Sequence, residues 1–259
     1  MSSVLPTFNP FYEPVATERY FTRQRKYDEV ERDRNDLGKM ADAFEERIRN
    51  WYVEPIEVLL ETRMSDWRKR LCRWLVRRQD GGHYSFTIAA MTCLLIDALS
   101  QFEAGLAEGT NGSFKAFVKQ HLPSYGASLT PAIDGYRPPS KCQPLSNLAD
   151  VLYHGFRCGI LHQAHAPLYC GIVPGKSPPR VEYTRHAKYA AGAVNSTVGS
   201  DCPVVVLYPE HLFDEVMAFF SSYLKNIKDK NPAYDAVRDK FKWKFSDSFG
   251  IDITAAVLT

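Results

Sequence analysis

Arg157 and His162 are the two side chains whose types and spacing point most clearly to chemistry. They lie in the segment LYHGFRCGILHQAHAP (residues 152–167), with four residues between them. Arginine is always cationic and presents several N–H donors suited to a phosphate, and histidine can transfer a proton near neutral pH. Together, the two side chains could polarise a phosphodiester and move the protons that its cleavage requires.

The position of this pair on one predicted helix sets a geometric condition. Residues five positions apart point about 140° away from each other on an ideal α-helix. The two side chains can therefore meet only through a long reach, a distortion at the helix end, or a second subunit.

Three other Arg–His pairs have comparable spacing. Arg77 and Arg78 precede His83, and Arg180 precedes His186. The first two pairs cross a Gly-Gly turn and the third lies in a segment of β-like composition, so context favours the pair in residues 152–167.

The histidines and cysteines do not predict a metal site. His154, His162 and His165 are close in sequence, but no acid or cysteine at a suitable spacing completes a ligand set. The motifs GxGxxG, GxSxG and HExxH are absent, as are a P-loop and an EF-hand loop. We therefore expect no metal and no cofactor. The six scattered cysteines form no CxxC pair, which favours a reducing cytoplasm.

Residues 63–78 (RMSDWRKRLCRWLVRR) form the only strongly basic block. It holds seven basic residues against the single acid Asp66, with Trp67 and Trp74 between them. The block is either a solvated helix with two tryptophans in the core or a surface that neutralises RNA phosphates. On the second interpretation, the RNA-binding candidates are Arg68, Lys69, Arg70, Arg73 and Arg77.

Hydrophobic periodicity indicates the elements that must position these side chains. The clearest amphipathic segments are predicted helices, at about residues 84–105, 113–121, 144–164 and 211–228. A long exposed helix is expected over residues 16–50, and Pro55 interrupts or opens a helix over residues 51–61.

Two segments have the composition of connections or strands. Residues 123–144 are rich in Pro, Gly and Ser and are predicted to be a connecting loop. Residues 166–209 contain short β-like runs and predict a small hairpin or sheet insertion.

Composition excludes several broad classes. The 259 residues are 45% hydrophobic with a formal charge of +2, which indicates a globular protein without a global basic field. The N-terminus does not read as a signal peptide. The most apolar stretch, residues 86–99, contains Asp97 and is shorter than the roughly 20 residues of a membrane span. We interpret it as a buried core helix and expect no membrane association.

The helix pattern resembles the HEPN superfamily (higher eukaryotes and prokaryotes nucleotide-binding). An apolar helix, TIAAMTCLLIDALSQFEAG, is followed by a loop, an LY..FR.GILH helix and a closing helix, over residues 84–228. The resemblance implies a mainly α fold, a HEPN-like helical bundle with a small β-hairpin insertion and a long N-terminal helical extension. We divide the chain into the extension (1–80), the HEPN-like domain (81–230, with the insertion at 166–209) and a C-terminal tail (231–259).

The resemblance also implies a function. Arg157 and His162 would be the catalytic residues of a metal-independent endoribonuclease, in which the 2′-hydroxyl of single-stranded RNA attacks the adjacent phosphorus. His154, Cys158 and Asp97 are further candidates beside the site. Family members often act as toxins or phage-defence effectors, which would add an antitoxin or a regulatory protein as partner.

The family's active sites usually form across a homodimer. Gly155 and Gly159 would permit close approach of two such helices, although they would serve equally for packing inside one chain. Cys158 stands where the family usually has a polar residue such as Asn. This departure favours the alternative function, a non-catalytic HEPN module that binds RNA, nucleotide or a partner protein.

Overall fold

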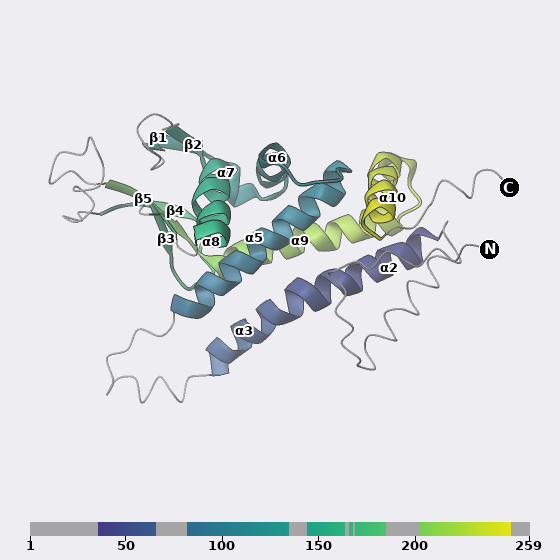
Figure 1. Ribbon diagram of the computed structural model, residues 1–259, viewed down its shortest axis with the longest axis horizontal. Helices are drawn as coiled ribbons and strands as arrows, with labels where there is room; N and C mark the ends of the chain where they lie inside the picture. The colour runs from purple at the N-terminus through teal and green to yellow at the C-terminus, as the bar shows by residue number, and fades with distance from the viewer. Residues whose placement is uncertain are drawn as a thin grey trace, which may run out of the picture.

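The protein is mainly α-helical, with one two-stranded and one three-stranded sheet (Figure 1). The computed structural model describes residues 36–65, 82–134, 144–163, 166–167, 169–184 and 202–249. The predicted mainly α fold class is confirmed.

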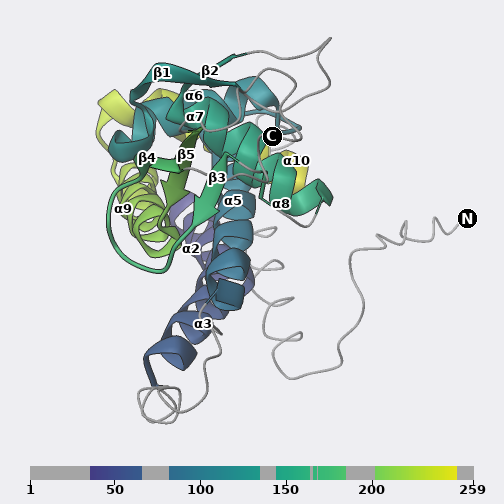
Figure 2. The same cartoon turned by 90° about the vertical axis from the view of Figure 1, so that its left-hand side faces the viewer.

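The N-terminal helices form one continuous rod that runs alongside the central helix (Figures 1 and 2). The rod consists of α2 (Leu37–Ile48), the π-helical turn η1 (Arg49–Val53) and α3 (Glu54–Ser65). Proline cannot donate a backbone hydrogen bond, so Pro55 would interrupt a regular helix. The wider turn η1 ends at Val53, two residues before this proline, and the N–H of Glu54 donates to the carbonyl of Arg49, five residues back.

The central helix is α5 (Gly82–Ala104), which contacts α3, α6, α9 and α10. Helical spacing predicts an inner face made of Ile88, Met91, Leu95, Leu99 and Phe102; Met91 is partly buried, and the other four are buried. Among the described residues, α5 is long and apolar enough to span a membrane, but 56% of that apolar window is buried inside the fold. More than half of this apolar stretch therefore packs inside the fold, as predicted for a buried core helix.

Three further helices complete the bundle. They are α6 (Asn111–His121), α9 (Pro209–Lys228) and α10 (Asp235–Phe249). The side chains of Thr110 and Ser113 cap the start of α6 reciprocally. A short 3₁₀ turn, η2 (Pro123–Tyr125), follows α6, and another, η5 (Pro232–Tyr234), precedes α10.

Residues 235–249, which the sequence assigned to a C-terminal tail, instead form a core helix. Phe241 and Phe245 of α10 are fully buried, and the Phe241 ring contacts the ring of Phe44 in α2. A single hydrophobic cluster extends from Met40 to Phe245. The N-terminal helices, the central segment and α10 therefore share one core.

The predicted connecting loop at 123–144 is wrong in part, because it contains a strand. Strand β1 (Ser128–Asp134) pairs antiparallel with β2 (Pro144–Asn147), with an irregularity in the register between Ser128 and Ile133. Pro131 falls within this irregular stretch, where a residue without an N–H is tolerated. Because β2 occupies Pro144–Asn147, the helix predicted from residue 144 begins only at Leu148.

The predicted insertion at 166–209 is confirmed as a small sheet. Strands β4 (Arg180–Thr184) and β5 (Cys202–Leu207) form an antiparallel pair, as a hairpin would. A third strand, β3 (Cys170–Ile172), pairs parallel with β5, which places β5 in the centre. Figure 2 shows this sheet beside the helical segment that carries Arg157.

That helical segment consists of three parts. They are α7 (Leu148–Val151), the π-helical turn η4 (Leu152–Arg157) and α8 (Cys158–Gln163). The side chain of Asn147 accepts a hydrogen bond from the backbone N–H of Asp150 and caps the start. A π turn holds one residue more than an α turn, and such turns occur frequently at functional sites.

Candidate functional site

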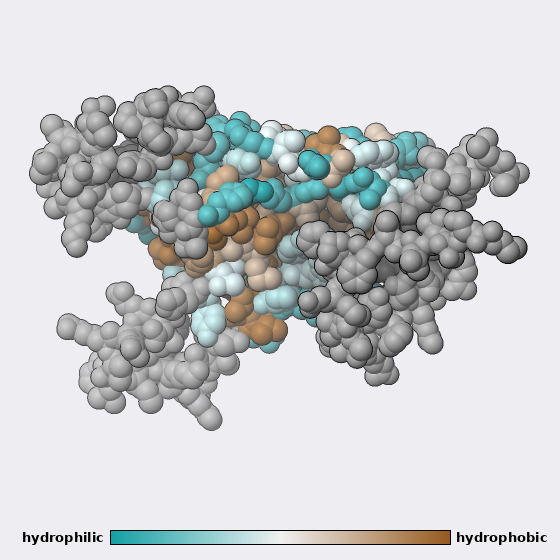
Figure 3. Space-filling view, viewed as in Figure 1, coloured by the Kyte–Doolittle hydropathy of each residue, from teal (hydrophilic) through white to brown (hydrophobic). Residues whose placement is uncertain are grey.

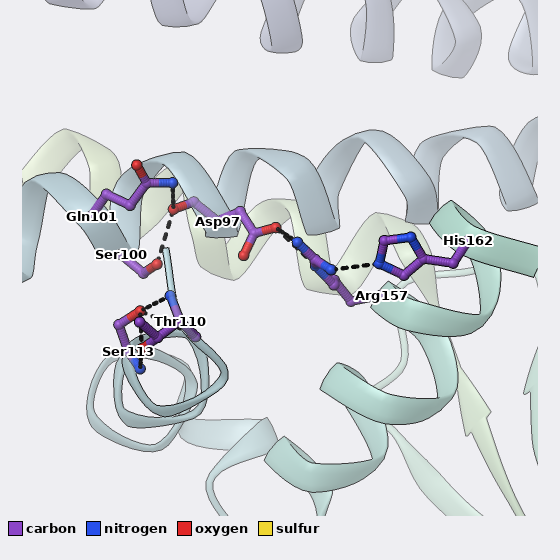
Figure 4. A network of polar contacts seen from close by, with 7 residues as sticks. All are labelled: Asp97, Ser100, Gln101, Thr110, Ser113, Arg157 and His162. Atoms are coloured by element: carbon purple, nitrogen blue, oxygen red, sulfur yellow. Dashed lines mark hydrogen bonds and ion pairs between the residues drawn. The ribbon is translucent and has the colours of Figure 1, made fainter. Parts of the chain in front are cut away.

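Asp97, Arg157 and His162 form a continuous polar chain between α5 and α8 (Figure 4). The Nε and Nη2 atoms of Arg157 lie 2.9 and 2.8 Å from Oδ2 of Asp97. Its third nitrogen, Nη1, lies 2.9 Å from Nε2 of His162. The structure thus brings both predicted catalytic residues together with Asp97, and a second predicted neighbour, Cys158, also contacts Arg157.

The meeting of Arg157 and His162 takes place within one chain. Arg157 is the last residue of η4, and the N–H of Cys158 donates to the carbonyl of Tyr153, five residues back. The extra residue of this π turn rotates Arg157 and His162 together by about 100° relative to the helix before it, so the turn sets which way the pair faces. The contact needs no second subunit.

Burial and charge act on Arg157 in opposite directions. Burial alone would lower its pKa, but the hydrogen bond and the negative charge of Asp97 raise the pKa above its usual value. The side chains of Arg157 and Asp97 are 23% and 15% exposed, respectively. Arg157 is therefore a fixed cation that still reaches solvent.

The contact with Arg157 defines the protonation of His162. A guanidinium group has only donors, so Nε2 of His162 must accept the hydrogen bond with its lone pair. The imidazole is consequently neutral and carries its proton on Nδ1. His162 is exposed, so this N–H can be reached from solvent.

Tyr153 and Cys158 complete the surroundings of the arginine. The guanidinium carbon of Arg157 lies 5.5 Å from the centre of the Tyr153 ring. Burial, followed by the influence of Cys158, raises the pKa of the Tyr153 hydroxyl. Cys158 also hydrogen bonds with Arg157. The sequence analysis missed Tyr153, although its position four residues before Arg157 places it on the same helical face.

A buried thiol lies behind the polar chain. Cys93 is one helical turn before Asp97 on α5 and is fully buried. Burial, and then the negative charge of Asp97, raise the pKa of this thiol well above its usual value. Cys93 therefore stays protonated and is a core residue.

The remaining predicted neighbour, His154, contacts Tyr153, whose ring lies against Arg157. Its ring meets the ring of Tyr153 edge-on, with centroids 5.0 Å apart. Of the competing Arg–His pairs, Arg180 pairs with Glu182 on β4. The other members, like the basic block beyond Ser65, lie outside the residues whose side chains the structure describes.

Gly155 is committed to packing inside the chain. A Cβ atom at Gly155 would lie 2.3 Å from Sγ of Cys170 on β3. Of the two roles left open by the sequence, close approach to a second subunit or internal packing, the structure supports internal packing for this glycine.

The part of the chain that the structure describes contains no group of three His, Cys, Asp or Glu side chains able to hold a metal ion. No protein-family model matches the chain, and neither a curated protein nor a solved structure matches it. The functional interpretation therefore depends on the geometry of the site.

Proposed function

We propose that the protein is a metal-independent endoribonuclease of the HEPN type that cleaves single-stranded RNA. The observation that supports this proposal is the chain of contacts from Asp97 through Arg157 to His162, at 2.8–2.9 Å. It combines a permanently charged phosphate ligand with a group that transfers protons at neutral pH.

Arg157 has a donor to spare for a phosphate. A guanidinium group carries five N–H bonds. Two of them point to Asp97, one points to His162 and Cys158 takes a further hydrogen bond, which leaves one for an oxygen of a phosphodiester. The carboxylate of Asp97 fixes the orientation of the group, so stabilisation of the charge that develops on the phosphate needs little rearrangement.

The reaction follows from the chemistry of RNA. The 2′-oxygen forms a bond to phosphorus, the bond from phosphorus to the 5′-oxygen breaks, and the products are a 2′,3′-cyclic phosphate and a 5′-hydroxyl. The proton lost by the 2′-hydroxyl and the proton gained by the 5′-oxygen pass through His162 and water. DNA lacks the attacking hydroxyl and would not be cleaved.

A homodimer in the cytoplasm is part of the proposal. Figure 3 shows apolar side chains over α5 and α3 on one face of the molecule. Leu94 of α5 is 39% exposed and Val58 of α3 is 59% exposed. Exposed apolar surface of this kind favours a protein contact. The contact would be a second copy of the chain, or the antitoxin or regulatory protein expected for a toxin or defence effector.

One observation favours the non-catalytic alternative. In the structure, the lone pair of His162 Nε2 is engaged by Arg157, and the thiol of Cys158 lies beside that arginine. A module that only binds RNA, nucleotide or a partner protein would keep this arrangement when its ligand is bound.

Incubation of the full chain with labelled single-stranded RNA in excess EDTA tests the proposal. Cleavage should survive chelation, and His162→Ala should lower the rate by about 10²- to 10⁴-fold while RNA binding is retained. Arg157→Lys should not restore activity, because a single ammonium group cannot replace the guanidinium fork. Arg180→Lys, a matched change on the exposed strand β4, should leave the rate unchanged. RNA binding without cleavage would establish the alternative.

A further inference from the structure

The contact between Arg157 and His162 joins two groups that are both cationic in acid. It exists only because Nε2 of His162 is unprotonated and accepts from Nη1 of Arg157 at 2.9 Å. If His162 takes up a proton, two N–H donors and two positive charges face each other at this point. Protonation of His162 must therefore open the contact.

The charges of the neighbouring groups show whether a positive charge on His162 would be balanced once its contact with Arg157 has opened. Asp97 on α5 is in contact with Arg157, so this carboxylate balances one positive charge. Tyr153, Cys93 and Cys158 are the other titratable groups whose charges interact with the arginine, and burial raises the pKa of the Tyr153 hydroxyl and the Cys93 thiol. Those two groups stay neutral. Among these described neighbours, a second positive charge on His162 has no partner.

We infer that a single oxyanion of the phosphate class binds between Arg157 and His162, displaces their mutual contact, and draws a proton onto His162. The anion accepts from the Nη1 of Arg157 that is released and from the newly protonated Nε2. It brings the negative charge that the protonated site lacks, so anion and proton bind with positive linkage.

This inference rests on the proposed function, in which the anion is the phosphodiester of RNA. The substrate's own phosphate would convert His162 from an acceptor into a donor. His162 would then protonate the leaving 5′-oxygen and regain its proton from water, while the 2′-hydroxyl loses its proton to water. Without substrate, the same histidine is in contact with Arg157.

Calorimetric titration of the full chain with sulfate tests the linkage, because sulfate does not itself titrate near neutral pH. Binding measured at one pH in two buffers of different ionisation enthalpy gives the number of protons taken up. We expect uptake approaching one proton per sulfate, and an affinity that falls by up to about tenfold per pH unit as the pH rises. The ¹⁵N shifts of the His162 ring should change from neutral imidazole to imidazolium when sulfate is added.

Three variants show which residue binds sulfate and which residue takes up the proton. His162→Gln should abolish proton uptake, Arg157→Gln should abolish sulfate binding, and His211→Gln, a matched change on α9 where the histidine contacts Ser124, should preserve both. Absence of sulfate binding, binding without proton uptake, or uptake that persists in His162→Gln would overturn the inference. Proton-linked sulfate binding without RNA cleavage would refute only the proposed function, and cleavage without the linkage would refute only the inference.

Discussion

Asp97→Asn separates the orienting role of the carboxylate from the shape of the site. The substitution keeps the size of the side chain but removes the negative charge that faces Nε and Nη2 of Arg157. Loss of one partner of a fully buried ion pair costs about 3–5 kcal/mol. Here both side chains keep some solvent, at 15% and 23% exposure, and Arg157 retains His162. We therefore expect a loss of about 2–3 kcal/mol in the free energy of unfolding.

Thermal unfolding measures this loss directly. In a chain of this size, about 1 kcal/mol shifts Tm by about 2–4 °C, so Asp97→Asn should lower Tm by about 4–12 °C. Asp150→Asn is a matched control, because Asp150 pairs with Lys115 at 3.0 Å with exposures of 17% and 25%. The control should lower stability to a similar extent but leave RNA cleavage unchanged, whereas Asp97→Asn should reduce cleavage more than RNA binding.

A double-mutant cycle tests whether Asp97 and Arg157 contribute to stability as a coupled pair. Asp97→Asn, Arg157→Gln and the double variant should give a coupling energy above about 1 kcal/mol, since contacting residues in one network are not additive. Effects on Tm that simply add would show that the two residues stabilise the fold independently, and the orienting role assigned to Asp97 would then fail.

Three further predictions concern other parts of the chain. Neutralising the three basic residues at 68–70 should weaken RNA binding and reduce the dependence of the affinity on salt concentration. If that dependence is unchanged, the basic block is only a solvated surface and does not contact RNA phosphates. His121 holds the pKa of Glu103 below its usual value, so the associated stability is present above about pH 4.3 and is lost as the pH falls through the lower folded value. Glu103→Gln should remove this acid-side loss in unfolding measured against pH. Gly155→Ala should cost about 1–3 kcal/mol in unfolding free energy, and Cys170→Ala should relieve most of it. Failure of that relief would place the crowding elsewhere.

The helices that were predicted well from the sequence have a pattern of apolar residues that lies entirely within the helix itself. In α5 and α9, the apolar residues that meet the core recur at helical spacing, so the buried face is visible without knowledge of its partner. The same signal was present in α10, where Phe241 and Phe245 are four positions apart, but no helix was predicted there and residues 231–259 were assigned to a C-terminal tail. Strand β1 carries no comparable local signal, because its pairing depends on residues ten or more positions further along the chain, such as Leu145 opposite Ile133.

In the candidate site too, a local pattern in the sequence identified the residues, but their contacts could not be predicted from it. The chemical types of Arg157 and His162 could be identified from one short segment, but their contact could not, because an ideal helix points them apart. A π turn has no residue signature that would have predicted η4. The role of Asp97 depends on contact with an arginine 60 positions away in the chain, which is set by how α5 and η4 pack.

The π turn η4 makes the length of this segment as important as its side chains. Leu152 and Phe156 within the turn are buried in the core, Arg157 is its last residue, and His162 lies five positions further on. Deletion of a single residue from 152–157 would convert the turn into regular α-helix and rotate everything after it by about 100°. Either the guanidinium group would then lose Asp97 or the buried residues would leave the core. Evolution and engineering can therefore exchange side chains in this turn more readily than they can shorten it.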